Sequence, residues 1–223
     1  MKQITTILAV LVSFTMSAQL SSVTENSKTG QRLTVSNAAN HGDIGSNAVD
    51  LSYSNSSSTT IGATGNYSIA MGYEPTASHD ASTAIGSSTV ASGWASTAMG
   101  LSTTASNSFS TSMGKYTQAS GNASTAMGES TTASGEQSTS MGKNTTASGS
   151  RSTAMGYNTS ASGPYSTAMG YGSSATGANT TAIGYYSTAS NYGSTAMGLY
   201  TKATADYSTA MGYGSYAYAD YST

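Results

Sequence analysis

Few residues of this chain have side chains that could do chemistry. It contains two histidines, His41 and His79, and no cysteine, so thiol nucleophiles, disulfides and thiolate metal sites are excluded. Neither histidine lies near a partner pattern for a catalytic triad or a metal site, and His79 is expected in a solvated turn. The nine acidic residues are scattered singly, without the paired spacing that general acid–base chemistry needs. We therefore expect no enzymatic activity, no metal site and no cofactor.

The charged residues also argue against nucleic-acid binding. The chain has seven Lys and Arg in 223 residues and a formal net charge of −2. These basic residues are spread along the sequence and form no basic patch. The Gly170-Tyr171-Gly172 stretch belongs to a longer repeat and is not a phosphate-binding loop.

The N-terminal residues resemble a secretory leader. Lys2 is followed by an apolar run over residues 4–14 and by small residues before Gln19. Such a pattern predicts a signal peptide over residues 1–18, since the run is too short to span a bilayer comfortably. We therefore expect a secreted or cell-surface protein whose remaining segment does not insert into a membrane.

Most of the chain repeats a single phrase, which reads Ser-Thr-Ala-Met-Gly at residues 96–100. Its glycine recurs eleven times from Gly72 to Gly212, with a spacing of 14 residues throughout. The residue before the glycine is Met in nine copies and Ile in two. An Ala follows the glycine by five residues in every copy, from Ala77 to Ala217. A fixed period of this kind is typical of a repeat architecture.

A period of 14 residues is compatible with a β-solenoid and with few other folds. The Gly, Ser and Thr content and the missing apolar heptads exclude a coiled coil. Collagen needs Gly at every third position, and the calcium-binding β-roll needs repeated Asp. Disorder would not keep Ala-Met-Gly in register through eleven copies. We predict an all-β parallel solenoid with one 14-residue coil per repeat, two strands per coil, and positive φ at the repeat glycine and at the Gly or Asn seven residues later.

Strand alternation assigns an inside and an outside to each coil. Ala two before the glycine, Thr or Ser three after it and Ala five after it point inward, while the residues one and three before it point outward. The outward Met or Ile form an apolar stripe, and exposed stripes of this length usually mark interfaces. The stripe is therefore expected to associate with copies of the same chain. It consists of Met71, Ile85, Met99, Met113, Met127, Met141, Met155, Met169, Ile183, Met197 and Met211.

The Ser-Thr-Ala-Met/Ile-Gly…Ala…Gly repeat resembles the YadA-like head repeats of trimeric autotransporter adhesins. The resemblance covers about residues 59–223 and implies a left-handed parallel β-roll in which three rolls pack side by side. It further implies that the stripe residues face the other two copies of a homotrimer. The family often has Val three residues before the glycine where this chain has Thr, which makes the interface more polar. The 223 residues contain no pattern expected of the family's neck, coiled-coil stalk or membrane barrel.

Residues 19–58 do not repeat and stand where a solenoid needs a cap over its open end. Short strands are expected at residues 33–35 and 49–53, separated by a polar loop. The repeats then occupy residues 59–223 and stop inside a twelfth phrase, which favours a fragment or a partner covering that edge.

Tyrosines gather at the variable positions, which we place in the turns. They become more frequent toward the C-terminus, and two interpretations remain open. Exposed Tyr is enriched at recognition surfaces, but it could equally shield the turns of adjacent coils.

The resemblance implies attachment, so the first hypothesis is a surface-displayed adhesin head that binds host, extracellular matrix or other cells. A passive spacer within a larger surface or secreted fibre is the alternative. A third hypothesis is ice binding by the outward Thr row, although its neighbouring row is Met or Ile where a second Thr row would be expected.

Overall fold

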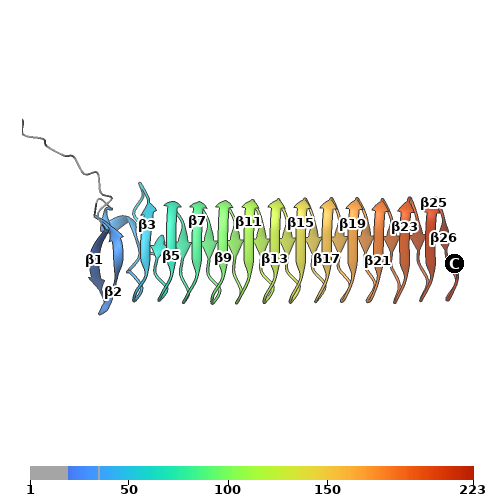
Figure 1. Cartoon of the computed structure of the whole chain (residues 1–223), viewed down its shortest axis with the longest axis horizontal. Helices are drawn as coiled ribbons and strands as arrows, with labels where there is room; N and C mark the ends of the chain where they lie inside the picture. The colour runs from blue at the N-terminus through green and yellow to red at the C-terminus, as the bar shows by residue number, and fades with distance from the viewer. Residues whose placement is uncertain (1–19, 35) are drawn as a thin grey trace, which may run out of the picture.

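A computed structural model describes residues 20–34 and 36–223 and shows a straight rod of stacked coils (Figure 1). Each coil contributes one long strand to a 14-stranded sheet and one short strand to a 12-stranded sheet. Within the described residues there is no α-helix, and η1 (Ala38–Asn40) is a short 3-10 turn. The predicted all-β parallel solenoid with coils of 14 residues is confirmed. The expected signal peptide lies outside the described residues.

The long sheet runs along the whole rod, and beyond β2 every neighbouring pair of its strands is parallel. Its strands, in spatial order, are β1 Leu20–Glu25, β2 Lys28–Leu33, β3 Val49–Tyr53, β5 Ile69–Tyr73, β7 Thr83–Ser87, β9 Thr97–Leu101, β11 Thr111–Lys115, β13 Thr125–Glu129, β15 Thr139–Lys143, β17 Thr153–Tyr157, β19 Thr167–Tyr171, β21 Thr181–Tyr185, β23 Thr195–Leu199 and β25 Thr209–Tyr213.

The short sheet closes each coil with two residues. Its strands are β4 Gly62–Ala63, β6 Thr76–Ala77, β8 Val90–Ala91, β10 Thr104–Ala105, β12 Gln118–Ala119, β14 Thr132–Ala133, β16 Thr146–Ala147, β18 Ser160–Ala161, β20 Ser174–Ala175, β22 Thr188–Ala189, β24 Lys202–Ala203 and β26 Tyr216–Ala217.

The N-terminal end of the long sheet is an antiparallel hairpin. β1 and β2 pair through a turn at Asn26 and Ser27, which both have positive φ, and β2 then pairs in parallel with β3. The strand expected at residues 49–53 is confirmed as β3. The strand expected at residues 33–35 is wrongly placed, because β2 ends at Leu33 and Thr34 lies in a turn. Val35 lies outside the described residues.

The interior of the coils matches the expected alternation. The Ala two residues before each repeat glycine and the Ala five residues after it are fully or almost fully buried, as Ala126 and Ala133 illustrate. Thr131, three residues after Gly128, is buried as well. The space between the long and the short strand of a coil therefore holds only small side chains such as Ala and Thr.

The repeat glycine is required twice over. Its φ lies between 102° and 131° in all eleven copies, a region that side chains rarely adopt. An added Cβ on Gly128 would also lie 2.0 Å from the carbonyl oxygen of Gly142 in the next coil. The glycine therefore lets successive coils approach at sheet spacing.

The expectation of positive φ at the second turn glycine is wrong. Gly121 and its equivalents, seven residues after the repeat glycine, have no positive φ, whereas residues two and nine after it do. Ser130 and Ala123 are examples, with φ of 54° and 52°. Gly121 is small for a different reason, because an added Cβ would lie 2.0 Å from the carbonyl oxygen of Gly135.

Buried hydroxyl groups explain the two repeats in which Ser replaces the inner Ala. Ser112 Oγ hydrogen bonds with Thr117 Oγ1 across the coil at 2.8 Å, and Ser140 pairs with Thr145 in the same way at 2.7 Å. In coils with Ala at this position, the matching hydroxyl can lack a partner, as at Thr131 among the described residues. Ser at this position therefore gives the buried Thr hydroxyl a hydrogen-bond partner.

Substitution of the repeat glycine should be far more damaging than substitution at a left-handed turn residue. We expect Gly128→Ala to lower the free energy of unfolding by at least about 3 kcal/mol, from strained φ plus overlap with the next coil. Ala123→Gly is the control, since its relief of left-handed strain and its added chain entropy nearly cancel, within about 1 kcal/mol. Denaturant unfolding followed by circular dichroism tests this, and equal effects of the two changes would contradict the assignment.

Removing a buried hydroxyl should have opposite effects in two neighbouring coils. Thr131→Val deletes an unpaired hydroxyl and should leave stability unchanged or slightly raised. Thr117→Val leaves Ser112 unpaired and should cost about 1–3 kcal/mol. The double variant Ser112→Ala/Thr117→Val should regain most of that loss. Thermal unfolding midpoints measure all three, and a loss in Thr131→Val as large as in Thr117→Val would refute the pairing argument.

Candidate functional site

The most extended surface feature is the apolar stripe on the outer face of the long sheet. Register places Met127 directly beside Met113 and Met141, and the same pairing continues along the sheet. Met71, Met99, Met197 and Met211 are exposed, and the other stripe residues are half-buried. The eleven side chains therefore form one unbroken ladder along the rod.

Two different rows flank the stripe. On one side, Thr side chains such as Thr125 stack in register with the Thr of adjacent coils. On the other side, the last residue of each long strand varies and includes an exposed ion pair between Lys143 and Glu129 at 3.2 Å. An exposed ion pair of this kind contributes about 0–1 kcal/mol to the free energy of unfolding. It therefore adds little beside the apolar stripe.

The tyrosines form ladders in the C-terminal half of the rod. Tyr157, Tyr171 and Tyr185 close successive long strands, and their rings stack with centroids 4.9 Å apart and an angle of 12° between planes. The placement of these three residues in turns is therefore wrong, since they end strands. Ring stacking at the coil spacing adds favourable aromatic contact to the backbone ladder.

A second tyrosine row lies on the neighbouring corner of the coil. Tyr186 and Tyr200 stack with centroids 5.9 Å apart, and Tyr186 also meets Tyr171 and Tyr185 edge to face. The pKa of Tyr186 is raised because a phenolate there would be repelled first by Tyr171, with lesser contributions from burial and its other neighbours. Tyr186 therefore stays a neutral hydrogen-bonding phenol at physiological pH.

A groove of about 560 Å3 opens beside this second row. It is lined by Gly172, Tyr186, Thr188, Tyr200, Lys202 and Tyr216. The Tyr186 ring lies over Gly172, in the space that a side chain there would fill, because an added Cβ on Gly172 would lie 2.6 Å from that ring. Lys202 Nζ lies 5.7 Å from the centre of the Tyr216 ring. The groove thus combines aromatic faces, hydroxyl groups and one positive charge.

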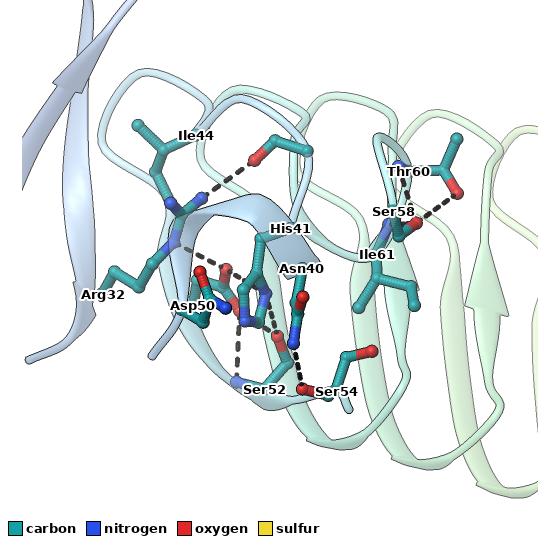
Figure 2. A network of polar contacts seen from close by, with 12 residues as sticks. Arg32, Asn40, His41, Ile44, Asp50, Ser52, Ser54, Ser58, Thr60 and Ile61 are labelled. Atoms are coloured by element: carbon teal, nitrogen blue, oxygen red, sulfur yellow. Dashed lines mark hydrogen bonds and ion pairs between the residues drawn. The ribbon is translucent and has the colours of Figure 1, made fainter. Parts of the chain in front are cut away.

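A buried polar network joins the hairpin to the first coil (Figure 2). Arg32 Nε donates to Asp50 Oδ2 at 3.1 Å, and Arg32 Nη1 donates to Glu25 Oε1 at 2.8 Å. The guanidinium also donates to the carbonyl of Gly42 at 2.9 Å. Asp50 is fully buried at the position where later coils carry Ala, so its charge depends on these partners.

The same network contains a Ser, a His and an Asp, but it is not a catalytic triad. Ser52 Oγ lies 3.1 Å and Asp50 Oδ2 lies 3.4 Å from the same atom, His41 Nδ1. A triad instead needs its Ser and its Asp on opposite ring nitrogens. Ser52 Oγ also donates to Asp50 Oδ1 at 2.5 Å. The arrangement therefore stabilises a buried carboxylate.

The two histidines differ in how far their surroundings could be predicted from the sequence. His79 is exposed in a turn, as expected, and its Nδ1 accepts from the Asp80 amide at 2.8 Å. Sequence reasoning missed the contacts of His41 with Asp50 and Ser52, which folding brings together without forming a triad. Asp50 and Ser52 are two residues apart in the predicted strand at 49–53, so both point to its inner face. An Asp that points inward needs a buried polar partner, and this signal could have been used.

Two further findings concern the described residues as a group. Within 20–34 and 36–223, no three His, Cys, Asp or Glu side chains gather closely enough to hold a metal ion. Among those same residues, no helix is long and apolar enough to cross a membrane.

Comparison with known families gives a match to the repeats. The family described as the YadA head domain repeat, whose profile contains two copies, matches residues 63–89, 91–117, 119–145, 147–173, 175–201 and 203–223. A search of curated proteins finds no match.

The buried carboxylate makes stability depend on acid pH. Burial disfavours ionisation of Asp50, but hydrogen bonds from His41 and Ser52 outweigh it and hold the pKa of Asp50 below its usual value. The stabilisation is therefore complete above the usual value of about 4 and is lost as pH falls through the lowered value. We expect Asp50→Asn to lower the free energy of unfolding by about 3 kcal/mol at neutral pH, because it removes one of the two carboxylates paired with the buried Arg32.

Thermal unfolding between neutral and acid pH would test this dependence. The Asp50→Asn protein should lose less stability on acidification than the unsubstituted chain. Asp43→Asn, which changes an exposed carboxyl on the same segment, serves as the control. Parallel pH profiles for the Asp50→Asn protein and the unsubstituted chain would show that Asp50 does not carry the effect.

Proposed function

Because the chain belongs to the YadA head domain repeat family, we propose that it forms the head or rod of a trimeric, surface-displayed adhesin. The observation that carries this proposal is the unbroken Met and Ile stripe on the long sheet. A monomer in water would leave this stripe uncovered along the full length of the rod, and such surfaces usually mark interfaces. The proposed role is attachment to a host, matrix or cell surface.

The stripe can supply enough free energy for stable assembly. Full burial of a Met or Ile side chain contributes about 1.5–3 kcal/mol. Because most stripe residues are already half-buried, covering all eleven is worth on the order of 10 kcal/mol per chain as an upper estimate. In the proposed homotrimer, each rod turns its long sheet toward the other two, and the Thr row beside the stripe adds polar contacts.

The proposed assembly leaves the other faces free to bind a ligand. The short sheet lies on the other face of the coil from the stripe, so three equivalent copies of it would face outward. Presentation in three copies raises the apparent affinity for a surface that carries many ligands. A secreted or cell-surface location follows from this role and from the leader expected at residues 1–18.

The spacer alternative differs from the adhesin proposal only in what the outward faces do. A passive spacer would assemble identically but would not adhere. Coated beads that carry the trimer should therefore stick to matrix or cells if the head binds, and beads coated with a spacer should not.

A charge on the stripe should break assembly without breaking the coil. We expect Met127→Asp to weaken trimer formation by at least tenfold, because three unpaired carboxylates would be desolvated close together. Thr132→Asp is the matched control, since it places the same charge in the same coil on the outer face of the short sheet. Sedimentation equilibrium measures the assembly, and circular dichroism reports the β structure.

Two results would contradict the proposal. One is a well-folded monomer of the unsubstituted chain at micromolar concentration. The other is loss of assembly in Thr132→Asp and its retention in Met127→Asp, which would place the interface on the short sheet.

A further inference from the structure

We propose that the groove at the second tyrosine row binds an acidic oligosaccharide. The inference rests on the proposed attachment function and names the chemical class of the ligand. The groove's volume of about 560 Å3 falls within the range of roughly 300–1,000 Å3 usual for ligand sites. Its lining residues come from four successive coils, so the groove runs along the rod axis.

Aromatic faces supply the first part of the recognition. Tyr186 and Tyr200 are about half exposed and stack in parallel with centroids 5.9 Å apart. Their facing sides cover each other, but the outer face of Tyr200 is open, because the next position in the row is Gly214, where an added Cβ would meet nothing within 4 Å. Sugar rings present a face of C–H groups that packs on an open aromatic face, such as the outer face of Tyr200.

Polar groups supply the second part. The Tyr hydroxyls and Thr188 can donate to or accept from sugar hydroxyls, and Lys202 adds three donors and a positive charge. Lys202 is the one charged residue among positions one to four after the repeat glycine in the last four coils. With no acidic side chain at these positions to neutralise it, the groove favours a ligand carrying carboxylates, such as a uronic acid chain.

A peptide fits the groove less well. Extended peptides commonly bind by adding a strand to an exposed sheet edge. At the groove, β22 and β24 already pair with neighbours on both sides, so no free edge is available there. The groove's partners are side-chain hydroxyls, rings and an ammonium group, which suit the hydroxyls and carboxylates of a sugar.

The position of the groove is compatible with trimer formation. Thr188, Lys202 and Tyr216 belong to the short sheet, while the Met and Ile stripe lies on the outer face of the long sheet. The two outer faces of the solenoid are opposite one another. This wall of the groove therefore faces away from the stripe in the assembly proposed above.

Titration calorimetry with the whole chain tests the inference, using oligogalacturonate as the acidic probe and a malto-oligosaccharide as the neutral one. We expect the acidic probe to bind more tightly. Tyr200→Ala should weaken its binding by about tenfold, through loss of a stacking face. Lys202→Gln should weaken it by about fivefold and reduce its salt dependence, with little effect on the neutral probe.

Matched variants outside the groove serve as controls. Tyr116→Ala removes a ring from the equivalent left-handed position of an earlier coil, where φ is 55° compared with 57° at Tyr200. Lys143→Gln removes an exposed charge elsewhere on the rod. Both should leave binding unchanged. Tyr200→Phe keeps the ring and should retain most of the affinity.

Three results would overturn the inference: no binding of oligogalacturonate, equal losses in Tyr200→Ala and Tyr116→Ala, or equally tight binding of oligoglutamate. The last would indicate a peptide or a simple charge contact. Sedimentation and bead adhesion of the same samples separate this failure from failure of the proposed function. Adhesive trimers that ignore the acidic probe would refute only the ligand, whereas a non-adhesive monomer would refute the function.

Discussion

Direct backbone contact between successive coils is the constraint on which the rest of the structure depends. Each long strand pairs in register with the same residues one repeat away, so Gly128 lies beside Gly114 and Gly142. In the repeats, the coils can approach this closely because the repeat glycine has no Cβ and the inner positions hold Ala, Ser, Thr or, in one copy, Pro75. The larger side chains of the repeats are consequently placed outside, which creates both the Met and Ile stripe and the tyrosine rows.

The repeating part of the fold could be predicted because one local rule is applied eleven times. Alternation alone placed Ala126 and Ala133 inside and Met127 outside, since a strand has a fixed period of two. The turns were harder. Left-handed φ at Ala123 and Ser130 has no distinctive residue type, because Ala, Ser, Tyr, Gln and Arg all occur at such positions. Those conformations are imposed by the coil, not by local preference.

The nonrepeating end could be predicted only in part. β3 follows from its alternation, but the hairpin of β1 and β2 turns at Asn26 and Ser27, which is not one of the Asn-Gly or Asp-Gly pairs that mark a two-residue turn in a sequence. Arg32, His41 and Asp50 meet through the fold, and their spacing in the chain carries no recognised motif. The groove was also missed from the sequence. Its Tyr residues are visible there only as an enrichment toward the C-terminus, and the row that they form with Gly172 appears only in the fold.

The ion pair between Arg32 and Asp50 also has a consequence for how the rod acquires its length. Neighbouring coils make nearly identical contacts, so a strand displaced by one whole repeat would find almost equivalent partners, and such slipped states compete during folding. The Asp50 carboxylate accepts hydrogen bonds from Arg32 and Ser52. No repeat copy has a carboxylate at the equivalent inner position. The first coil therefore pairs with the hairpin in a single register. Duplication or deletion of repeats can change the length of the rod by about 4.8 Å per copy while the starting point stays the same.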